Sequence, residues 1–166
     1  MQSRTFYGIS VAIVVLVSLY VLVWAGLRAA PALPPILTDI FATSTLGSLG
    51  FMDINTPNGT IHAVIASTSA AREEGLSGMP MLAKDSGMLF VFPNAGSYGF
   101  WMKDMNFPID MVWIGADKKV RGVVFGAATS TYPNVFYPPA PVPYVLELDS
   151  GGARDHRIAT GTELVF

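Results

Sequence analysis

The chain has no cysteine among its 166 residues. This excludes a disulfide framework, a thiolate metal site, a cysteine nucleophile and an acylated lipoprotein cysteine. A domain without disulfide bonds must be held by its core alone, on whichever side of a membrane it lies. Charged residues are also scarce, at 13 %, whereas hydrophobic residues make up 51 %. This balance is typical of a membrane-associated chain, and the length predicts one domain plus a smaller segment.

Recognisable catalytic motifs are missing as well. The two histidines, His62 and His156, are far apart, and no ligand spacing indicates a metal site. No serine stands in a nucleophile elbow, and no glycine pattern of the P-loop or dinucleotide type occurs, so we predict no cofactor. Two of the 10 Lys and Arg residues, Arg4 and Arg28, precede the bulk of the chain. The remaining 8 stand against 12 Asp and Glu, and this net charge of −4 argues against nucleic acid as a partner.

One long uncharged run extends from residue 6 to residue 27. About 20 apolar residues suffice to cross the roughly 30 Å hydrocarbon layer as a helix. Aromatic residues lie towards both ends of the run, as they do at membrane interfaces. The sequence therefore predicts a short flank at 1–5 and a transmembrane helix at 6–27. The alternative is a cleaved signal peptide, whose apolar core would be shorter and followed by a small-x-small site.

Residues 28–50 form a predicted linker rich in Pro, Ser and Thr. The prolines at its start cannot continue a helix, and the composition indicates a semi-extended tether. Apolar residues at helical spacing between 33 and 41 leave a short amphipathic helix on the membrane surface as the alternative. With the amino terminus and Arg4 on one side of the span and only Arg28 on the other, we expect a single-pass protein of the cell membrane with an extracytoplasmic domain.

Residues 51–166 contain short apolar runs separated by turn signals. We expect strands at 60–66, 87–92, 98–103, 109–114, 119–125, 144–148 and 162–166. A short helix at 70–74 should end at Gly75, and 153–159 should hold one or two helical turns. Pro93 to Gly96 should end the second strand, and 128–143 should be a long proline-rich loop. The pattern predicts a mainly β (α+β) domain, a small antiparallel barrel or sandwich with one or two short helices.

Five segments of this domain occur together in a distinctive order. They are Glu74-Gly75-Leu76, Gly87-Met88-Leu89-Phe90-Val91-Phe92, Phe100-Trp101-Met102-Lys103, Pro108-Ile109-Asp110 and Tyr144-Val145-Leu146-Glu147-Leu148. Over about residues 51–166 the chain resembles the DUF192 family, a set of small prokaryotic domains of uncharacterised function. The resemblance implies a compact, mainly β, barrel-like fold with a short helix, often behind an export signal. It implies no known reaction.

Two stretches depart from the pattern of that family. Asp104-Met105 stands where the family usually has Asn-Thr. Ser77-Gly78-Met79 stands where it usually has Met and then, two residues on, Arg. If these positions form a polar site in the family, the charge of that site is altered here.

The segment from Gly99 to Ile114 sets charged residues among aromatics and methionines. Buried charges without partners are costly, so Lys103, Asp104 and Asp110 must be solvated, paired or part of a site. Paired with Asp110 or Glu147, Lys103 would serve as an anion clamp or, when desolvated, a general base. The plainer interpretation, which we favour, is a structural ion pair that locks the turn across the intervening proline.

Further candidate binding residues are aromatic or basic. An arginine on the short helix can hold a carboxylate or a ligand through two parallel hydrogen bonds, although plain solvation there is the simpler reading. Tyrosines of the proline-rich loop and its surroundings would line a groove for a sugar or peptide, whereas core packing explains most phenylalanines equally well. The candidate site residues are Arg72, Trp101, Lys103, Asp104, Asp110, Tyr137, Tyr144 and Glu147.

These features predict a membrane-anchored, extracytoplasmic binding or interaction module of the cell envelope. Its ligand would be a glycan, a peptide or an envelope protein, held in an aromatic-rimmed cleft near Trp101. One alternative is an envelope-acting hydrolase that uses Asp104 or Asp110 with Lys103, which requires these groups to converge in one water-accessible cleft. The other is a structural subunit of an envelope complex, which a large apolar surface patch would favour.

Overall fold

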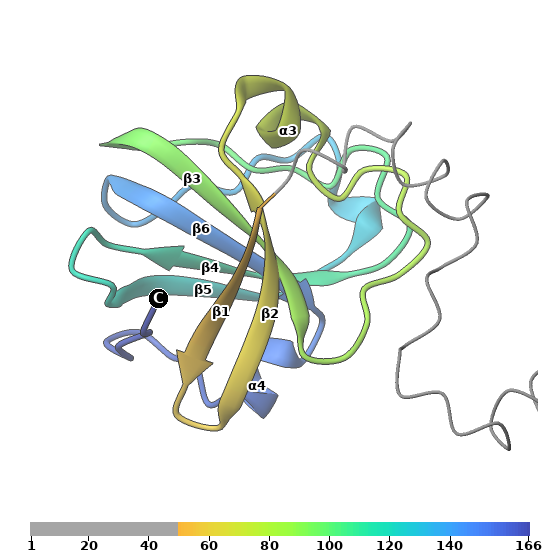
Figure 1. Ribbon diagram of the computed structural model, residues 1–166. Coiled ribbons are helices and arrows are strands. Elements are labelled where there is room, and N and C mark those ends of the chain that lie inside the picture. Colours follow the sequence, from red (N-terminus) through yellow and green to blue (C-terminus); the bar gives the residue numbers. More distant parts are fainter. Residues whose placement is uncertain (1–49) are drawn as a thin grey trace, which may run out of the picture. The chain divides into compact units, whose positions relative to one another are not determined.

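The computed structural model describes residues 50–166, and these residues form a six-stranded β-sheet with two short α-helices (Figure 1). The strands are β1 (Phe51–Thr56), β2 (Gly59–Ala66), β3 (Ser86–Gly96), β4 (Ile109–Ile114), β5 (Val120–Ala127) and β6 (Val142–Asp149). The helices are α3 (Ser69–Glu74), α4 (Gly152–Asp155) and the 3-10 turn η2 (Thr129–Thr131). The prediction of a mainly β domain with one or two short helices is confirmed.

The sheet has the strand order β1-β2-β3-β6-β4-β5 and is mixed. Four of its pairs are antiparallel, as expected, but β2 and β3 run parallel. The reason is the connection between them. Helix α3 lies between the two strands in the chain, and a crossover of this kind returns the chain in its original direction. The expectation of a wholly antiparallel sheet is therefore wrong at this one pair.

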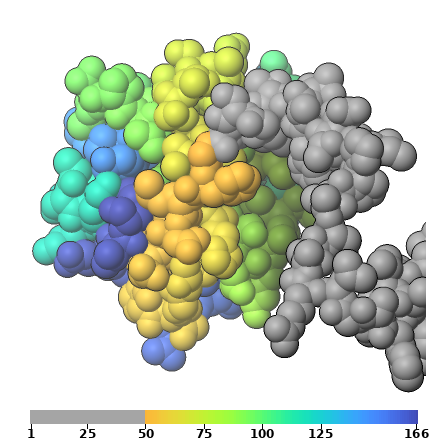
Figure 2. Space-filling model, viewed as in Figure 1, coloured from red at the N-terminus to blue at the C-terminus, as the bar shows by residue number. Residues whose placement is uncertain are grey.

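Both edges of this open sheet contact the C-terminal segment. Val165 bridges to Asn55 of β1, and Glu163 bridges to Lys119 just before β5. In Figure 2 the dark blue C-terminal residues lie beside the orange β1 strand and next to the cyan-green β4–β5 region. The predicted strand at 162–166 is thus reduced to isolated bridges, and the expected barrel is an open sheet whose two edges share one segment.

Each face of the sheet has its own hydrophobic core. Helix α3 and the loop between β3 and β4 cover one face, on which Phe90, Met111 and Val145 are buried. Helix α4 and the C-terminal segment cover the other, on which Leu146 and Leu148 are buried. Side chains alternate across a strand, so neighbouring residues of β6 enter different cores. Figure 1 shows α3 and α4 at opposite ends of the view, each beside the sheet face that it covers.

Several local predictions are confirmed and others need correction. Thr68 caps α3 by accepting a hydrogen bond from the Ala71 N–H at 3.1 Å, and the helix ends at Gly75, whose φ is +53°. Strand β3 does not end before Pro93: it continues to Gly96 through a shift of register. The expected strand at 98–103 is a loop with one bridge, between Phe100 and Phe136. Strand β1 was not predicted, because its pairing with β2 across a two-residue turn outweighs its weak apolar pattern.

The predicted transmembrane helix at 6–27 and most of the linker at 28–50 lie outside the described residues. Within residues 50–166, no helix is long and apolar enough to cross a membrane.

Candidate functional site

Glu147 lies in the middle of the sheet, on the central strand β6. Its register partners are Met88 on β3 and Met111 on β4, so an ionisable side chain stands between two buried methionines. Because Leu146 and Leu148 enter the core on the α4 side, Glu147 faces the α3 side. The residue is 5 % exposed. The alternation of β6 therefore places one carboxyl group on an otherwise apolar face.

A pocket of about 240 Å³ opens above this carboxyl group. Aromatic residues of β3 and of the following loop supply much of its wall: Phe90, Phe92, Tyr98, Phe100 and Trp101. The rings pack on one another, with Phe92 stacked on Tyr98 at 3.7 Å between centroids and Phe90 set edge-to-face against Phe100 at 5.0 Å. We call this hollow the aromatic pocket. Its size suits a small molecule or one group of a larger ligand.

The Glu147 carboxyl group has no hydrogen-bond or ion-pair partner among residues 50–166. Burial alone acts on its protonation, because removal from water penalises the charged form. This desolvation raises the pKa of Glu147 from its ordinary value of 4.5 to about 8. At neutral pH the group is mostly protonated, and it can donate a hydrogen bond into the pocket. An isolated carboxyl with a strongly raised pKa in a cleft is characteristic of functional sites.

Helix α3 forms one side of the same pocket with Arg72, Glu73 and Glu74. The Arg72 guanidinium donates hydrogen bonds to the Ser67 carbonyl and, at 3.0 Å, to the Val91 carbonyl. It also lies 5.1 Å from the centroid of the Phe92 ring. Arg72 therefore fastens α3 to β3 and packs against Phe92 of the aromatic wall, and it forms no ion pair with Glu147 in the described part of the chain.

Trp101 and Lys103 stand at the surface on the loop that borders the pocket. Trp101 lines the pocket and is 53 % exposed, an unusual position for so large an apolar side chain. The Lys103 Nζ lies 4.0 Å from an Asp104 carboxylate oxygen, and both side chains are largely exposed. The expected ion pair of Lys103 with Asp110 or Glu147 is not formed, because the Lys103 side chain is largely exposed whereas both carboxyl groups are buried.

Asp110 is fully buried at the start of β4, and its side chain faces the α4 side of the sheet. Its Oδ1 accepts a hydrogen bond from the Gly126 N–H at 2.7 Å. Its Oδ2 accepts two more, from the Gly151 and Ala153 N–H groups, each at 3.0 Å. These bonds tie β4 to the end of β5 and to the start of α4. The structure therefore places Asp110 in a structural role, apart from the exposed Lys103 and Asp104.

The two candidate tyrosines lie in different places. Tyr144 faces the α4 side of the sheet, where its ring packs edge-to-face on Phe166 at 5.4 Å and lies 3.6 Å from the Lys118 ammonium. Tyr137 is 60 % exposed on the proline-rich loop. That loop is joined to the pocket loop by reciprocal hydrogen bonds between the backbones of Phe100 and Phe136, at 2.9 and 2.7 Å. Of the eight candidates, only Arg72, Trp101 and Glu147 line the aromatic pocket.

The model of the DUF192 family, described as "Uncharacterized ACR", matches residues 52–166. The chain belongs to the DUF192 family. No curated protein matches it.

Solved structures with the fold of this DUF192 domain include two bacterial proteins. One is a candidate transcription regulator from Sinorhizobium meliloti 1021, 29 % identical, with a TM-score of 0.63 over 68 % of this chain and 89 % of that one. The other is a protein of unknown function from Novosphingobium aromaticivorans, 25 % identical, with a TM-score of 0.64 over 84 % of this chain and 94 % of that one.

The stretches in which this chain departs from the usual DUF192 pattern contact each other. The Ser77 hydroxyl donates to the Lys103 carbonyl at 3.1 Å, and the Gly78 N–H donates to the Asp104 carbonyl at 2.9 Å. Ser77 and Met105 also line the aromatic pocket. Each of the two departing stretches thus contributes one residue to the lining of the pocket.

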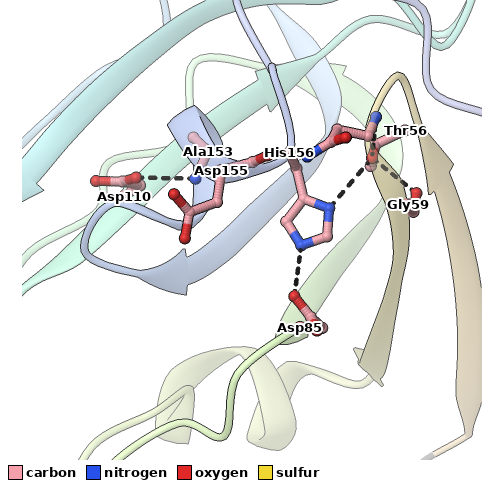
Figure 3. A network of polar contacts seen from close by, with 8 residues as sticks. Thr56, Gly59, Asp85, Asp110, Ala153, Asp155 and His156 are labelled. Carbon is pink, nitrogen blue, oxygen red and sulfur yellow. Dashed lines mark hydrogen bonds and ion pairs between the residues drawn. The ribbon is translucent and has the colours of Figure 1, made fainter.

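The buried His156 belongs to a partly buried polar network that the sequence did not reveal (Figure 3). Its Nε2 lies 3.2 Å from an Asp85 carboxylate oxygen, and its Nδ1 lies 3.2 Å from the Thr56 hydroxyl. That hydroxyl also donates to the Gly59 carbonyl at 2.7 Å. The network joins the β1–β2 turn, the segment before β3 and the end of α4. Since 100 residues separate Thr56 from His156, no local signal could have paired them.

His62 is paired separately, with Asp53 at 2.7 Å on the exposed side of the β1–β2 hairpin. Among residues 50–166, no group of three histidine, aspartate or glutamate side chains is placed to hold a metal ion. The residues that sequence reasoning missed at the aromatic pocket are Phe90, Phe92 and Phe100. Phe90 and Phe92 are two residues apart in a strand, so their side chains lie on the same face of the sheet. This spacing is the signal from which the sequence could have predicted that both belong to one site.

Proposed function

We propose that this DUF192 protein is a membrane-anchored, extracytoplasmic ligand-binding module of the cell envelope. The uncharged run at 6–27 supports the anchor and the location. The aromatic pocket supports the binding role. Its ligand would be a small molecule, or one group of a glycan, a peptide or an envelope protein.

One observation carries the binding proposal: Glu147 is a lone buried carboxyl group at an aromatic-walled opening. Burying an ionisable group without a partner costs several kcal/mol, of order 2–7 for a neutral polar group and more for a charge. An apolar side chain between Met88 and Met111 would be more stable. A cost of this kind is characteristic of sites that must bind or react, where strain or desolvation is retained for function.

The hydrolase alternative receives less support from the geometry. It needs Lys103, Asp104 and Asp110 in one water-accessible cleft. Asp110 is fully buried and its carboxylate oxygens accept three backbone hydrogen bonds, whereas the other two side chains are exposed. Nucleic-acid binding is likewise disfavoured by the acidic balance of the chain after Arg28.

Binding at the aromatic pocket can be followed through Trp101, whose half-exposed indole borders the opening. We expect a saturable change of tryptophan fluorescence when the full-length protein in detergent is titrated with small sugars, amino acids, amines and envelope fragments. The Trp101→Phe variant should lose the change, whereas Trp113→Phe should keep it because Trp113 is buried in the core at 3 % exposure. A panel without any saturable response, in a protein whose unfolding transition is intact, would contradict the binding proposal.

The anchor is tested separately by cell fractionation. We expect the full-length chain to stay in the membrane pellet after an alkaline wash, and a variant without residues 1–29 to be recovered in the supernatant. The physical reason is that a span of about 20 apolar residues inserts effectively irreversibly. A full-length chain that washes off the membrane would overturn the anchor and leave the pocket untouched.

A further inference from the structure

The chemistry of the aromatic pocket restricts the charge of its ligand, on the premise that the pocket binds one at all. Four ionisable groups of known sign line it: Glu73, Glu74 and Glu147 are acidic, and Arg72 is basic. The single cation of this lining, Arg72, donates hydrogen bonds to the carbonyl oxygens of Ser67 and Val91 and lies over the ring of Phe92. An anionic ligand would therefore approach a buried carboxyl group, and the one cation of the lining is already engaged by two carbonyl oxygens of the protein.

The aromatic walls of the pocket favour a positively charged ligand. Faces of aromatic rings attract cations through their quadrupole, by up to about 2 kcal/mol or more when the cation is desolvated. Five aromatic residues line this opening. At its floor, Glu147 lacks the counter-charge that would let it ionise, between the uncharged side chains of Met88 and Met111. Rings around a lone carboxyl group are complementary to a positively charged alkyl group.

We propose that the aromatic pocket binds a small organic cation, an amine or quaternary ammonium group, whose charge pairs with the Glu147 carboxylate while the rings enclose its alkyl part. Binding then ionises the carboxyl group, and one proton leaves for the solvent. The bound group belongs either to a free small molecule or to a side chain of lysine type on a peptide, and both present the same chemistry to the pocket.

The dependence of affinity on pH separates this proposal from the binding of a neutral ligand. A cation needs the ionised carboxylate, so its affinity should rise with pH as the ionised fraction of Glu147 grows towards and through about pH 8. A neutral ligand that accepts a hydrogen bond needs the protonated form, and its affinity should fall over the same range. The other titratable groups at the pocket are Arg72, Glu73 and Glu74 of α3 and Tyr98 of the loop.

The test is calorimetric titration of the full-length protein with choline and with its uncharged analogue 3,3-dimethyl-1-butanol, with n-butylammonium as the lysine-like probe. We expect choline or n-butylammonium to bind about tenfold or more tightly than the neutral analogue. Their affinity should rise about tenfold or more from about pH 6 to about pH 9. Binding should release close to one proton at about pH 6, where Glu147 is protonated beforehand, and almost none at about pH 9. The proton count follows from repeating the titration in buffers with different ionisation enthalpies.

Two variants complete the experiment. Glu147→Gln should lose cation binding and its pH dependence while it keeps the fold, and Glu163→Gln, an exposed glutamate away from the pocket, should bind as the wild type does. Equal binding of choline and its neutral analogue, or cation binding that survives in Glu147→Gln, would overturn the cation proposal and leave the binding module standing. Absence of binding by every probe here and by the whole fluorescence panel would overturn both.

Discussion

Replacement of Asp110 by asparagine should lower the free energy of unfolding by about 3–5 kcal/mol, because the carboxylate accepts three backbone N–H groups in a fully buried position. Asparagine has the same shape, but it offers one oxygen in place of two and turns an NH₂ group towards N–H donors. Buried donors left without an acceptor cost about 1–3 kcal/mol each. Denaturant unfolding followed by the fluorescence of buried Trp113 measures the effect.

Asp104→Asn is the matched control for this substitution. The Asp104 side chain is 71 % exposed, and asparagine tolerates its left-handed backbone, so the unfolding free energy should change by less than about 0.5 kcal/mol. If Asp110→Asn changed the free energy of unfolding as little as this control does, the hydrogen bonds of Asp110 would not be what holds β4 to the end of β5 and to α4.

Glu147→Gln should stabilise the fold by about 3–5 kcal/mol at about pH 9 and by close to nothing at about pH 4. In the unfolded chain Glu147 has an ordinary pKa of 4.5, whereas burial raises its pKa to about 8 in the fold. Below pH 4.5 both states are protonated, and the group contributes no difference. Between the two values the folded state must retain a proton that the unfolded state releases, so wild-type stability falls as pH rises. Above about pH 8 the loss is complete.

Unfolding curves of both proteins across this pH range test the prediction. All other titrating groups are common to the two chains, so the difference in their unfolding free energies isolates Glu147. Glu163→Gln, which removes an exposed carboxylate, should show no comparable pH-dependent difference. A constant difference between wild type and Glu147→Gln at every pH would mean that the Glu147 carboxyl group is solvated in the native protein.

Asp110 and Glu147 also show which properties of a residue its local sequence can predict and which it cannot. Both stand in strands that the sequence predicted, and both were candidate site residues. Their roles differ because of their surroundings: Asp110 meets three backbone donors from β5 and from the β6–α4 turn, whereas Glu147 meets two methionines. These partners come from other strands and turns, so nothing in the local sequence of either residue distinguishes a structural acceptor from an unpaired acid.

The difference between local signals and contacts between distant residues also explains which predictions of the fold were wrong. Strands β2 to β6 and helix α3 were predicted from short apolar runs and a terminal glycine, signals that act within a few residues. The loop at 98–103 has the composition of a strand, yet it pairs through a single bridge because it folds over the sheet face instead of joining its edge. Tertiary packing overrides β-propensity at such places.

The sequence by itself determined the mainly β class, the family, most strand positions and the expectation of a membrane span, because each of these depends on composition or on periodicity along the chain. Only the tertiary structure decided that β2 and β3 run parallel, that Lys103 and Asp110 lie apart, and that Glu147 lies alone beneath a set of aromatic rings. Such facts depend on which distant residues become neighbours, and burial then sets the charge and the chemistry of each group.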